Sequence, residues 1–568
     1  MAKLLWKPVP APDRTSVHRK FGLLLFLAAG AAAAVALTDC GGGGGGGGGT
    51  SAPSAGSGPP STAPQPTTHT DVVTYRVDAG RTAANLTESV LTPANVNSSS
   101  FGLLRVLPVD GKVDAQPLYL AQVPIAGGTH NVVYVATEHD SVYAFDPQTG
   151  AALWHVSVLG SGEIPSDDHS CGQITPEIGV TSTPVIDRSA GPHGAIFVVA
   201  MSKDASSNYH QRLHALDITT GAELFNGPVT ISPSFTGPGG VTKAFSPGQH
   251  AERAALLLEN HTIYTSWTSH CDFQPYSGWV IAFSETTLAQ AAVINLAADS
   301  DAGPSIWMSG DGLAADSSGN IYLATANGVF DTTLNSGGLP ENGDYGNSFI
   351  KLSTAGGRLA VADYFSPSNE VAESAADQDL GSGGVMLLPD VNDSGGLVRH
   401  LLMGAGKDGN LYVINRDNMG KFNPSSDMTW QQLNGIFPSG VFSTPAYFNG
   451  TVYYGDVSDT LKAFPVAAAK LSSSPSSETT TIFPYPGTSP AVSANGTSNA
   501  IVWAVENASP AVLHAYDATN LTHELYNSTQ APGGRDQFGA GNKFISPAIA
   551  DGMVFLGTPN SVAVFGIL

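Results

Sequence analysis

The sequence predicts an all-β protein folded as an eight-bladed β-propeller, with four antiparallel strands in each blade. Three observations lead to this prediction: the composition, a unit that repeats eight times, and a β segment without a partner ahead of the first repeat. The chain of 568 residues contains 65 Gly and 38 Pro, and only 12% of its residues are charged. This composition favours many short strands joined by tight turns over long helices.

The repeat is clearest at residues 131–154, which read NVVYVATEHDSVYAFDPQTGAALW. Two runs of β-forming residues flank a short polar turn, and a Thr-Gly turn leads to a third run that ends in Trp. The second run carries an Ala-aromatic-Asp motif, whose copies recur about every 50 to 70 residues. The copies mark eight units, at Ala144, Ala215, Ala282, Lys351, Val413, Ala463, Ala515 and Ala563.

Several units begin with a Pro, which suits the start of a strand because it has no N–H to donate. These are Pro117, Pro184, Pro445, Pro490 and Pro547. A four-stranded unit repeated in this way is typical of a radial propeller. The eighth unit supplies only three strands, and residues 101–109 (FGLLRVLPV) have nothing else to pair with. We therefore expect residues 101–109 to close the ring as the outer strand of the eighth blade, whereas a solenoid would leave them unpaired.

Residues 1–40 have the features of an export signal with a lipoprotein-type anchor. Basic residues precede an apolar run at 21–37, which is short and Ala-rich for a membrane-spanning helix. The run leads into Leu37-Thr38-Asp39-Cys40, which resembles a bacterial lipoprotein box in which Cys40 is lipidated, although Asp39 departs from that pattern. An uncleaved N-terminal anchor is the alternative. Either one would hold the exported protein at a membrane, on its periplasmic or cell-surface side.

Residues 41–70 are rich in Gly, Ser, Pro and Thr, so we expect a flexible tether between this anchor and the propeller at 71–568. The formal net charge of −23 argues against nucleic acid as a partner, because binding to phosphates depends on Lys and Arg. No C-x-x-C-H haem motif is present. A hydrolase finds little support, since neither G-x-S-x-G nor H-E-x-x-H occurs.

The unit A-x-D-x-x-T-G-x-x-x-W resembles the blade-docking repeat of the pyrroloquinoline quinone (PQQ) alcohol dehydrogenases. Residues 85–104 (NLTESVLTPANVNSSSFGLL) are similar to the segment that precedes the first blade of that family. The resemblance extends from about Arg81 to Leu568 and implies a quinoprotein-type propeller. It further implies PQQ- and calcium-dependent oxidation of an alcohol or sugar. The electrons would then pass to a separate acceptor, because the chain has no haem motif.

The resemblance also implies which residues would contact PQQ. Asp114, in Asp-Ala-Gln-Pro, is similar to a cofactor-binding carboxylate before the first full blade. Trp307, in Ser-Ile-Trp, corresponds to the residue that forms the floor beneath the quinone. Lys407, in the segment KDGNLYVINR, corresponds to the residue beside the quinone oxygens.

The calcium ligands and the catalytic base are implied in the same way. Asp272 stands where the family has a calcium-binding Glu, and Asn327 lies in a Thr-Ala-Asn-Gly turn that resembles the next ligand turn. Asp377 and Asp379 both match the segment with the catalytic Asp, and the sequence does not distinguish them. Two features depart from the family: the adjacent Cys pair is missing, and Asp272 is one methylene shorter than Glu.

The loops after the second strand of each blade and the loops between blades should emerge on one face of the ring. Cys171 and Cys271 both fall in such loops, in neighbouring parts of the ring. Because export favours oxidation, we expect a disulfide between them.

A cofactor-free scaffold is the alternative function. The propeller lipoprotein of the outer-membrane-protein assembly machinery is of this kind, and it needs only a rigid ring with exposed loops. The partner would then be another protein of the cell envelope, and no cofactor would be bound.

Overall fold

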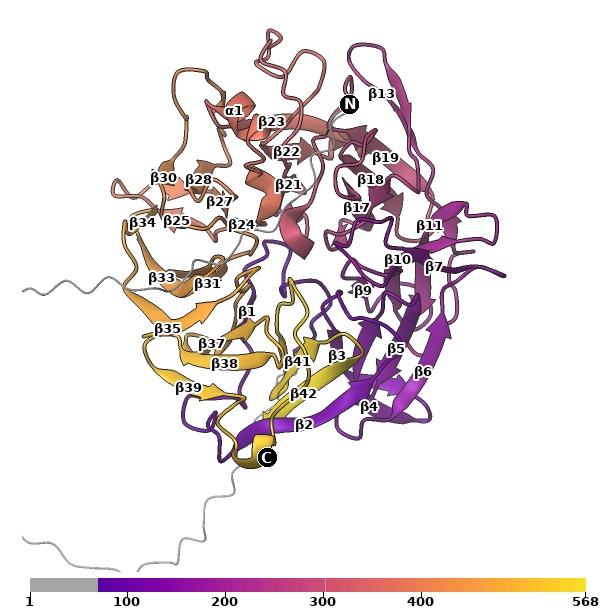
Figure 1. Cartoon of the computed structure of the whole chain (residues 1–568), viewed down its shortest axis with the longest axis vertical. Coiled ribbons are helices and arrows are strands. Elements are labelled where there is room, and N and C mark those ends of the chain that lie inside the picture. Colours follow the sequence, from indigo (N-terminus) through magenta and orange to yellow (C-terminus); the bar gives the residue numbers. More distant parts are fainter. Residues whose placement is uncertain (1–69, 302) are drawn as a thin grey trace, which may run out of the picture. The chain divides into compact units, whose positions relative to one another are not determined.

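The computed structural model describes residues 70–301 and 303–568, which belong to one compact unit. Their strands form eight sheets of four or more strands, arranged as blades around a ring (Figure 1). The predicted propeller is thereby confirmed, and all eight marker residues lie in the third strand of their blades. The predicted anchor at 1–40, Cys40 and nearly all of the predicted tether lie outside the described residues. No helix of residues 70–301 and 303–568 is long and apolar enough to cross a membrane.

The first four blades follow in chain order. Blade 1 comprises β3 (Leu118–Ile125), β4 (Gly128–Ala136), β5 (Ser141–Phe145) and β6 (Ala152–Ser157). Blade 2 comprises β9 (Val185–Asp187), β10 (Ala195–Lys203), β11 (Tyr209–Asp217) and β12 (Val229–Thr230), extended by β7 (Ile164–Asp167) and β8 (Glu177–Ile178). Blade 3 comprises β16 (Leu257–Glu259), β17 (Thr262–Ser269), β18 (Trp279–Ser284) and β19 (Gln290–Asn295), with β15 (His250–Ala251). Blade 4 comprises β20 (Ala314–Ala315), β21 (Ile321–Ala324), β22 (Phe349–Ser353) and β23 (Ala360–Ser366), with β29 (Lys421–Phe422).

The remaining blades complete the ring. Blade 5 comprises β24 (Val385–Leu387), β27 (Leu401–Ala405), β28 (Leu411–Asn415) and β30 (Gln431–Leu433). Blade 6 comprises β31 (Ala446–Phe448), β32 (Thr451–Gly455), β33 (Asp459–Ala467) and β35 (Ser477–Phe483), with β34 (Lys470–Leu471). Blade 7 comprises β36 (Ala491–Asn495), β37 (Ser498–Glu506), β38 (Val512–Asp517) and β39 (Glu524–Asn527), with β1 (Ala84–Asn85). Blade 8 comprises β40 (Ala548–Ala550), β41 (Met553–Gly557), β42 (Ser561–Ile567) and β2 (Phe101–Pro108).

Four strands per blade therefore holds for the body of each sheet, and several blades carry additional short strands. These strands come from loops that turn back along an edge, as β29 does when it pairs in parallel with β23. Two hairpins lie outside the blades, β13 (Ser234–Thr236) with β14 (Thr242–Ala244) and β25 (Val391–Asn392) with β26 (Val398–Arg399).

The closing Trp of the repeat docks one blade against the next. Trp154 of β6 donates a hydrogen bond from Nε1 to the Ile218 carbonyl oxygen of blade 2, at 2.9 Å. The ring of Trp154 packs against Gly221, whose φ of +70° is disfavoured for residues with a Cβ and where a Cβ would approach the ring to 2.9 Å. The Trp of one repeat and the Thr-Gly turn of the next repeat therefore form one contact between neighbouring blades.

The ring closes through β2, as the sequence predicts. Phe101 pairs with Ile567 and Pro108 with Ser561, in an antiparallel ladder with β42. The buried Phe101 ring lies 5.4 Å from the Trp503 ring and 5.0 Å from the Tyr526 ring, measured between centroids. Blade 8 is thus completed by a strand from the other end of the described chain.

Residues 72–85 run along the inner strands of the ring. Arg81 is fully buried and donates from Nε to Leu313 O at 2.9 Å and from Nη2 to Leu256 O at 3.3 Å. Arg76, also buried, donates to Pro445 O of blade 6. The backbone of this segment forms hydrogen bonds with six blades. The bonded pairs are Val72–Tyr119, Val73–Ile186, Ala79–Ala315, Gly80–Leu387, Thr82–Tyr447 and Ala83–Val492.

The two ends of the strands give the ring two faces. The loops after each second strand and the loops between blades emerge on one face, which we call the loop face. The turns between first and second strands and between third and fourth strands emerge on the other, the hairpin face, where residues 72–85 lie. The predicted site residues lie in loops of the loop face, which makes this face the place of a candidate site.

Candidate functional site

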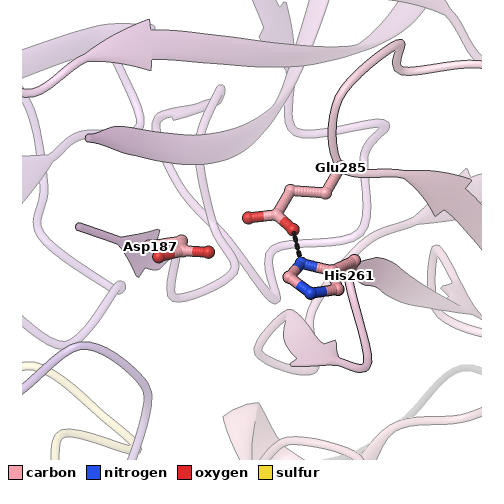
Figure 2. A group of neighbouring side chains, drawn as sticks. All are labelled: Asp187, His261 and Glu285. Carbon is pink, nitrogen blue, oxygen red and sulfur yellow. Dashed lines mark hydrogen bonds and ion pairs between the residues drawn. The ribbon is translucent and has the colours of Figure 1, made fainter. Parts of the chain in front are cut away.

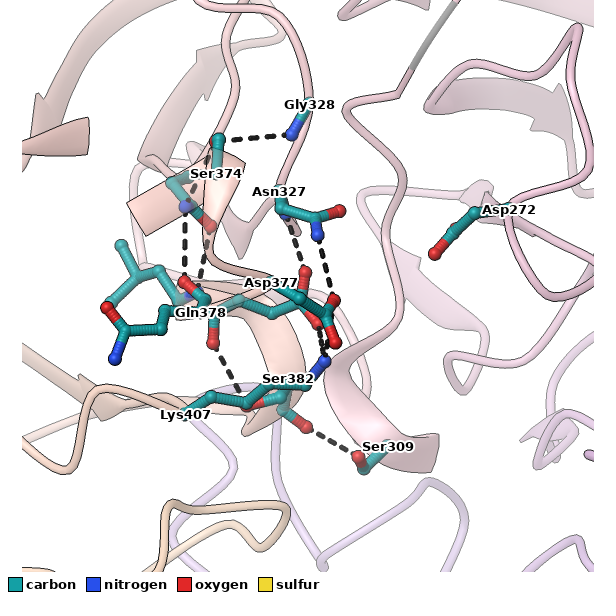
Figure 3. A network of polar contacts seen from close by, with 12 residues as sticks. Asp272, Ser309, Asn327, Gly328, Ser374, Asp377, Gln378, Ser382 and Lys407 are labelled. Carbon is teal, nitrogen blue, oxygen red and sulfur yellow. Dashed lines mark hydrogen bonds and ion pairs between the residues drawn. The ribbon is translucent and has the colours of Figure 1, made fainter. Parts of the chain in front are cut away.

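Four of the predicted site residues meet on the loop face, and we call them the Lys407 cluster: Asn327, Asp377, Asp379 and Lys407. Lys407 Nζ lies 3.0 Å from Asp377 Oδ1 and also forms an ion pair with Asp379 Oδ2. Asn327 donates from its backbone N–H to Asp379 Oδ1 at 2.8 Å and from Nδ2 to Asp377 Oδ1 at 3.0 Å. One ammonium group and one Asn thus bridge both carboxylates (Figure 3).

Hydrogen bonds around the short helix α1 (Glu370–Ala375) hold the cluster in place. Ser374 Oγ accepts a hydrogen bond from the Gly328 N–H at 3.3 Å, which ties α1 to the turn after β21. Asn347 Oδ1 accepts the Leu380 N–H at 2.9 Å, at the start of the 3₁₀ helix η3 (Leu380–Ser382). Asp377 and Asp379 are therefore held on a loop that is fixed at both ends.

The two carboxylates differ in their surroundings. The Asp379 side chain is 11% exposed, whereas that of Asp377 is 69% exposed. Burial raises the pKa of Asp379, although Lys407 opposes the shift. Against the effect of its own burial, Asp379 and then Asp377 raise the pKa of Lys407, which keeps the ammonium charged. Asp379 therefore has the surroundings of a proton acceptor in a dry site.

Asp272, the predicted third oxygen ligand, does not join the Lys407 cluster (Figure 3). Its Oδ1 accepts a hydrogen bond from Ser269 Oγ at 2.7 Å. Burial and then the neighbouring Asp272 raise the pKa of the Tyr276 phenol, and Asp379 and Asp377 add smaller contributions. Tyr276 therefore lies closer to Asp272 than to the Lys407 cluster, and the charges of Asp272, Asp379 and Asp377 all act on it.

Trp307 directly precedes the 3₁₀ helix η1 (Met308–Gly310) and is partly buried. Ser309 Oγ donates to the Ser382 carbonyl oxygen, which joins η1 to η3 and so to the loop of Asp379 (Figure 3). A Cβ at Gly310 would come within 3.9 Å of Phe544 Cβ. Trp307 thus belongs to a segment that lies between the Lys407 cluster and Phe544.

Cys171 and Cys271 are joined by a disulfide, with their Cα atoms 5.5 Å apart. The bond links the loop between β7 and β8 of blade 2 to the loop that follows β17 of blade 3. Asp272 follows Cys271 directly, so the disulfide also limits where Asp272 can move.

A second group, the Arg253 cluster, lies on the loop face and comprises Arg253, Lys543, Lys112 and Phe544. The Arg253 guanidinium carbon lies 4.7 Å and Lys543 Nζ 5.6 Å from the centre of the Phe544 ring. Arg253 is only 3% exposed, and neither its Nε nor its Nη1 finds an acceptor among the described residues. Burial, then Arg253 and Lys112, lower the pKa of Lys543 to about 8.

Asp114 lies at the edge of the Arg253 cluster. Lys112 Nζ is 2.9 Å from its Oδ2, and Asn542 donates from Nδ2 to its Oδ1 at 2.7 Å. Although burial opposes the shift, Lys112 and then Arg253 lower the pKa of Asp114 to about 2. Asp114 therefore stays ionised and neutralises part of the cationic group.

Tyr485 lies near both clusters: burial raises the pKa of its phenol, and the charges of Arg253 and then Lys407 oppose that shift. Its ring lies 5.4 Å from the Phe442 ring and 6.4 Å from the Phe544 ring. These aromatic side chains occupy much of the space between the clusters. A cavity lined by Phe442, Asn542 and Phe544 measures only about 10 Å³, whereas one of about 450 Å³ lies among Asp316, Tyr322 and Arg416 and shares no residue with either cluster.

Sequence reasoning missed Arg253, Lys543 and Phe544. Arg253 carries the one usable signal, because a Glu-Arg pair directly before an apolar strand is unusual in a chain with so few charges. Lys543 and Phe544 lie in a loop without a distinctive motif, and only the closed ring brings them to Arg253.

No protein-family model matches the sequence, and a search of curated proteins finds no match. Solved structures do match. A quinohemoprotein alcohol dehydrogenase from Comamonas testosteroni aligns with a TM-score of 0.56 at 16% identity, over 87% of this chain and 80% of that one. The chain has the propeller fold of the quinoprotein alcohol dehydrogenases.

Two further structures share this quinoprotein fold. A quinohemoprotein alcohol dehydrogenase from Pseudomonas putida HK5 aligns with a TM-score of 0.54 at 14% identity, over 88% of this chain and 80% of that chain. A europium-containing methanol dehydrogenase aligns with a TM-score of 0.52 at 13% identity, over 87% of this chain and 98% of that one. At these identities the likeness concerns the fold, and function has to be argued from the site.

Proposed function

We propose that the loop face binds PQQ together with a calcium ion, and that the protein oxidises an alcohol or sugar there. The observation that carries the proposal is the Arg253 cluster, in which a buried guanidinium has unused donors beside a desolvated ammonium group and an aromatic face. PQQ is a planar tricarboxylate. The unused donors of the buried Arg253 guanidinium suit a carboxylate, and Phe544 suits a flat ring. The residues present therefore fit the cofactor.

The oxygen donors of the Lys407 cluster, together with the separate Asp272, fit a calcium ion in type. Asn327, Asp272 and Asp377 or Asp379 offer carboxylate and amide oxygens, the hard ligands that calcium prefers. Asp272 lies apart from the others, and its short side chain would reach the ion through a shift of its loop or through a water molecule. When bound, PQQ would accept the electrons of the substrate, and calcium would polarise the quinone.

The chain itself would supply the proton acceptor and the orientation. Asp379 is buried with a raised pKa, and it lies beside the predicted position of the cofactor, so it would accept the proton of the substrate hydroxyl. Lys407 would hold Asp379 in position and present its charge to the quinone oxygens. Trp307 would lie beneath the ring, and Asp114 would stay at the edge of the cationic group.

The decisive experiment titrates the purified apo-protein with PQQ and calcium, first for binding and then for dye reduction with a panel of alcohols and aldose sugars. We expect calcium-dependent binding and turnover. An Arg253→Gln variant that stays folded should bind PQQ at least tenfold more weakly. Unchanged binding in that variant would contradict the assignment of the Arg253 cluster.

A cofactor-free scaffold is the second candidate, and the aromatic filling of the space between the clusters favours it. A tricyclic quinone could enter this space only if the Tyr485 and Phe544 side chains moved apart. If PQQ does not bind with or without calcium, the scaffold explains the fold better. In either case we propose an exported protein held at a membrane through its N-terminal segment.

A further inference from the structure

Three side chains on the hairpin face lie together where blades 2 and 3 meet. Asp187 comes from the end of β9, His261 from the turn between β16 and β17, and Glu285 follows β18 (Figure 2). One potential ligand atom from each lies within 4.8 Å of the other two. The group is far along the strands from the loop face, so neither candidate cluster explains it.

Part of this group is a common feature of the repeat. A His near the turn between the first two strands pairs with the acidic residue after the third strand in several blades. His261 Nδ1 lies 2.8 Å from Glu285 Oε2, and the corresponding distances are 2.9 Å for His130–Asp146, 2.7 Å for His193–Asp217 and 3.0 Å for His400–Asp417. A His–carboxylate pair on its own is therefore a structural link between two turns of one blade.

Asp187 distinguishes blade 3 from the other blades. Among the described residues, only Asp187, His261 and Glu285 place three potential ligand atoms all within 4.8 Å of one another. Asp187 belongs to the neighbouring blade, and no Lys or Arg of the described part of the chain forms an ion pair with it or with Glu285. Asp187, the second carboxylate of the group, therefore adds negative charge that the turn contact between His261 and Glu285 does not need.

Glu285 contributes to this group a buried oxygen without a hydrogen-bond donor in the described part of the chain. Its side chain is only 2% exposed, and Oε1 receives no hydrogen bond from a donor group of the described residues. Figure 2 shows one Glu285 oxygen bonded to His261 and the other turned toward Asp187.

Asp187 is oriented for the same space by its own neighbours. Ser189 donates from its backbone N–H and from Oγ to Asp187 Oδ1, both at 2.7 Å. These bonds fix the Asp187 carboxylate through Oδ1. Outer hydrogen bonds of this kind are what orient the carboxylate ligands of metal sites.

We propose that Asp187, His261 and Glu285 bind a divalent transition metal, zinc in the first instance, which joins blade 2 to blade 3. One imidazole nitrogen and two carboxylates form a ligand set that suits zinc, whereas calcium and magnesium prefer oxygen ligands alone. Water would complete a four-coordinate site. Zinc bonds of about 2.0–2.2 Å require ligand atoms roughly 3.4 Å apart, so the group has to contract slightly. The His261 side chain is 84% exposed and can make this movement.

The test uses the purified full-length protein, stripped of metal with a chelator and then dialysed against zinc. We expect the wild type to hold one more zinc ion per chain than His261→Ala, and to show a rise in Tm with zinc that this variant lacks. Asp187→Asn should weaken zinc binding at least tenfold. Because Asp187 and His261 are not deeply buried, both variants should fold.

His193→Ala is the matched control, since it removes the same kind of His–carboxylate pair in blade 2, where no second carboxylate of the described residues completes a group of three. It should keep the extra zinc ion and the rise in Tm. Calcium and magnesium should not replace zinc in the wild type. Equal zinc content in wild type and His261→Ala, or equal losses in His261→Ala and His193→Ala, would overturn the proposal and leave an ordinary turn contact.

Discussion

Asp377 and Asp379 lie two positions apart and share Lys407, yet only Asp379 is withdrawn from water. We expect Asp379→Asn to lower the turnover of the PQQ- and calcium-loaded protein by about 10²- to 10⁴-fold, the range for loss of a general base. Asp377→Asn should stay within about tenfold, because an exposed carboxylate is replaceable by solvent. Dye-linked oxidation rates decide the matter, with melting curves to confirm that both variants fold. A larger loss in Asp377→Asn would reverse the assignment.

The surroundings of Lys543 predict how stability and PQQ affinity depend on pH. Its pKa is lowered from 10.5 to about 8, so the folded protein disfavours the ammonium form, and unfolding takes up a proton between these values. Stability should therefore rise with pH across that window. A bound carboxylate would favour the charged form, so the affinity for PQQ should fall as the pH rises through about 8. Binding titrations from pH 7 to pH 9 test this, and Lys543→Gln should flatten the dependence; a flat wild-type profile would exclude Lys543 from the site.

At this scale the sequence indicated residues that the structure brings together, while their roles stay predictions. Asn327, Asp379 and Lys407 each lie in a short turn with its own pattern, and the structure brings them together. Asp272 could not be placed in the same way, because its distance from the others depends on how a disulfide loop lies above blade 3. Arg253 and Lys543 meet across the ring and share no local signal.

Among the elements, the six-residue helix α1 is unusual because it contains two buried carboxyl groups. Glu370 and Glu373 are 1% and 3% exposed, and burial raises the pKa of each to about 7. Both groups favour the protonated form when folded, so the stability they support is full below about pH 4.5 and is lost as the pH rises to about 7. A Glu370→Gln, Glu373→Gln double variant should be more stable than the wild type at pH 8, by roughly 1–3 kcal/mol.

Chemical denaturation at pH 5 and pH 8 checks this prediction. The gain should shrink at pH 5, where the wild-type carboxyl groups carry protons. A gain of the same size at both values would mean that packing, and not charge, causes it.

The sequence did not predict α1, since six residues give too short a pattern to separate from a loop. It did predict the blade strands, because each copy of the repeat has the same alternation of β runs and turns. The additional strands such as β29 were missed, because a loop pairs with a blade edge only once the blade exists.

For the whole ring, closure by β2 can be tested at Phe101. Its ring fills a buried space among Trp503, Tyr526 and Phe565. Phe101→Ala should cost about 3–5 kcal/mol, the usual range for a buried Phe. Val106→Ala is the control on the same strand, because Val106 is 42% exposed and should cost less than about 1 kcal/mol. Urea denaturation of both variants measures the difference, and equal costs would argue against Phe101 as the closing contact.

The proposed membrane attachment concerns the whole molecule as well. Cys40→Ser should release the protein from the membrane fraction and remove the mass of a lipid from the mature chain. Cell fractionation and intact mass spectrometry measure both. A mature protein of unchanged mass that stays membrane-bound would favour the uncleaved anchor.

Closure by β2 also has a kinetic consequence. Almost the whole described chain separates β2 from β42, and residues 72–85 likewise bond to blades that lie hundreds of positions downstream. Contacts of such high contact order form slowly, because a long loop must close before they contribute stability. Until then blade 8 presents an unpaired strand edge, and such edges invite association with other chains. The last step of folding is therefore also the step at which aggregation competes most directly.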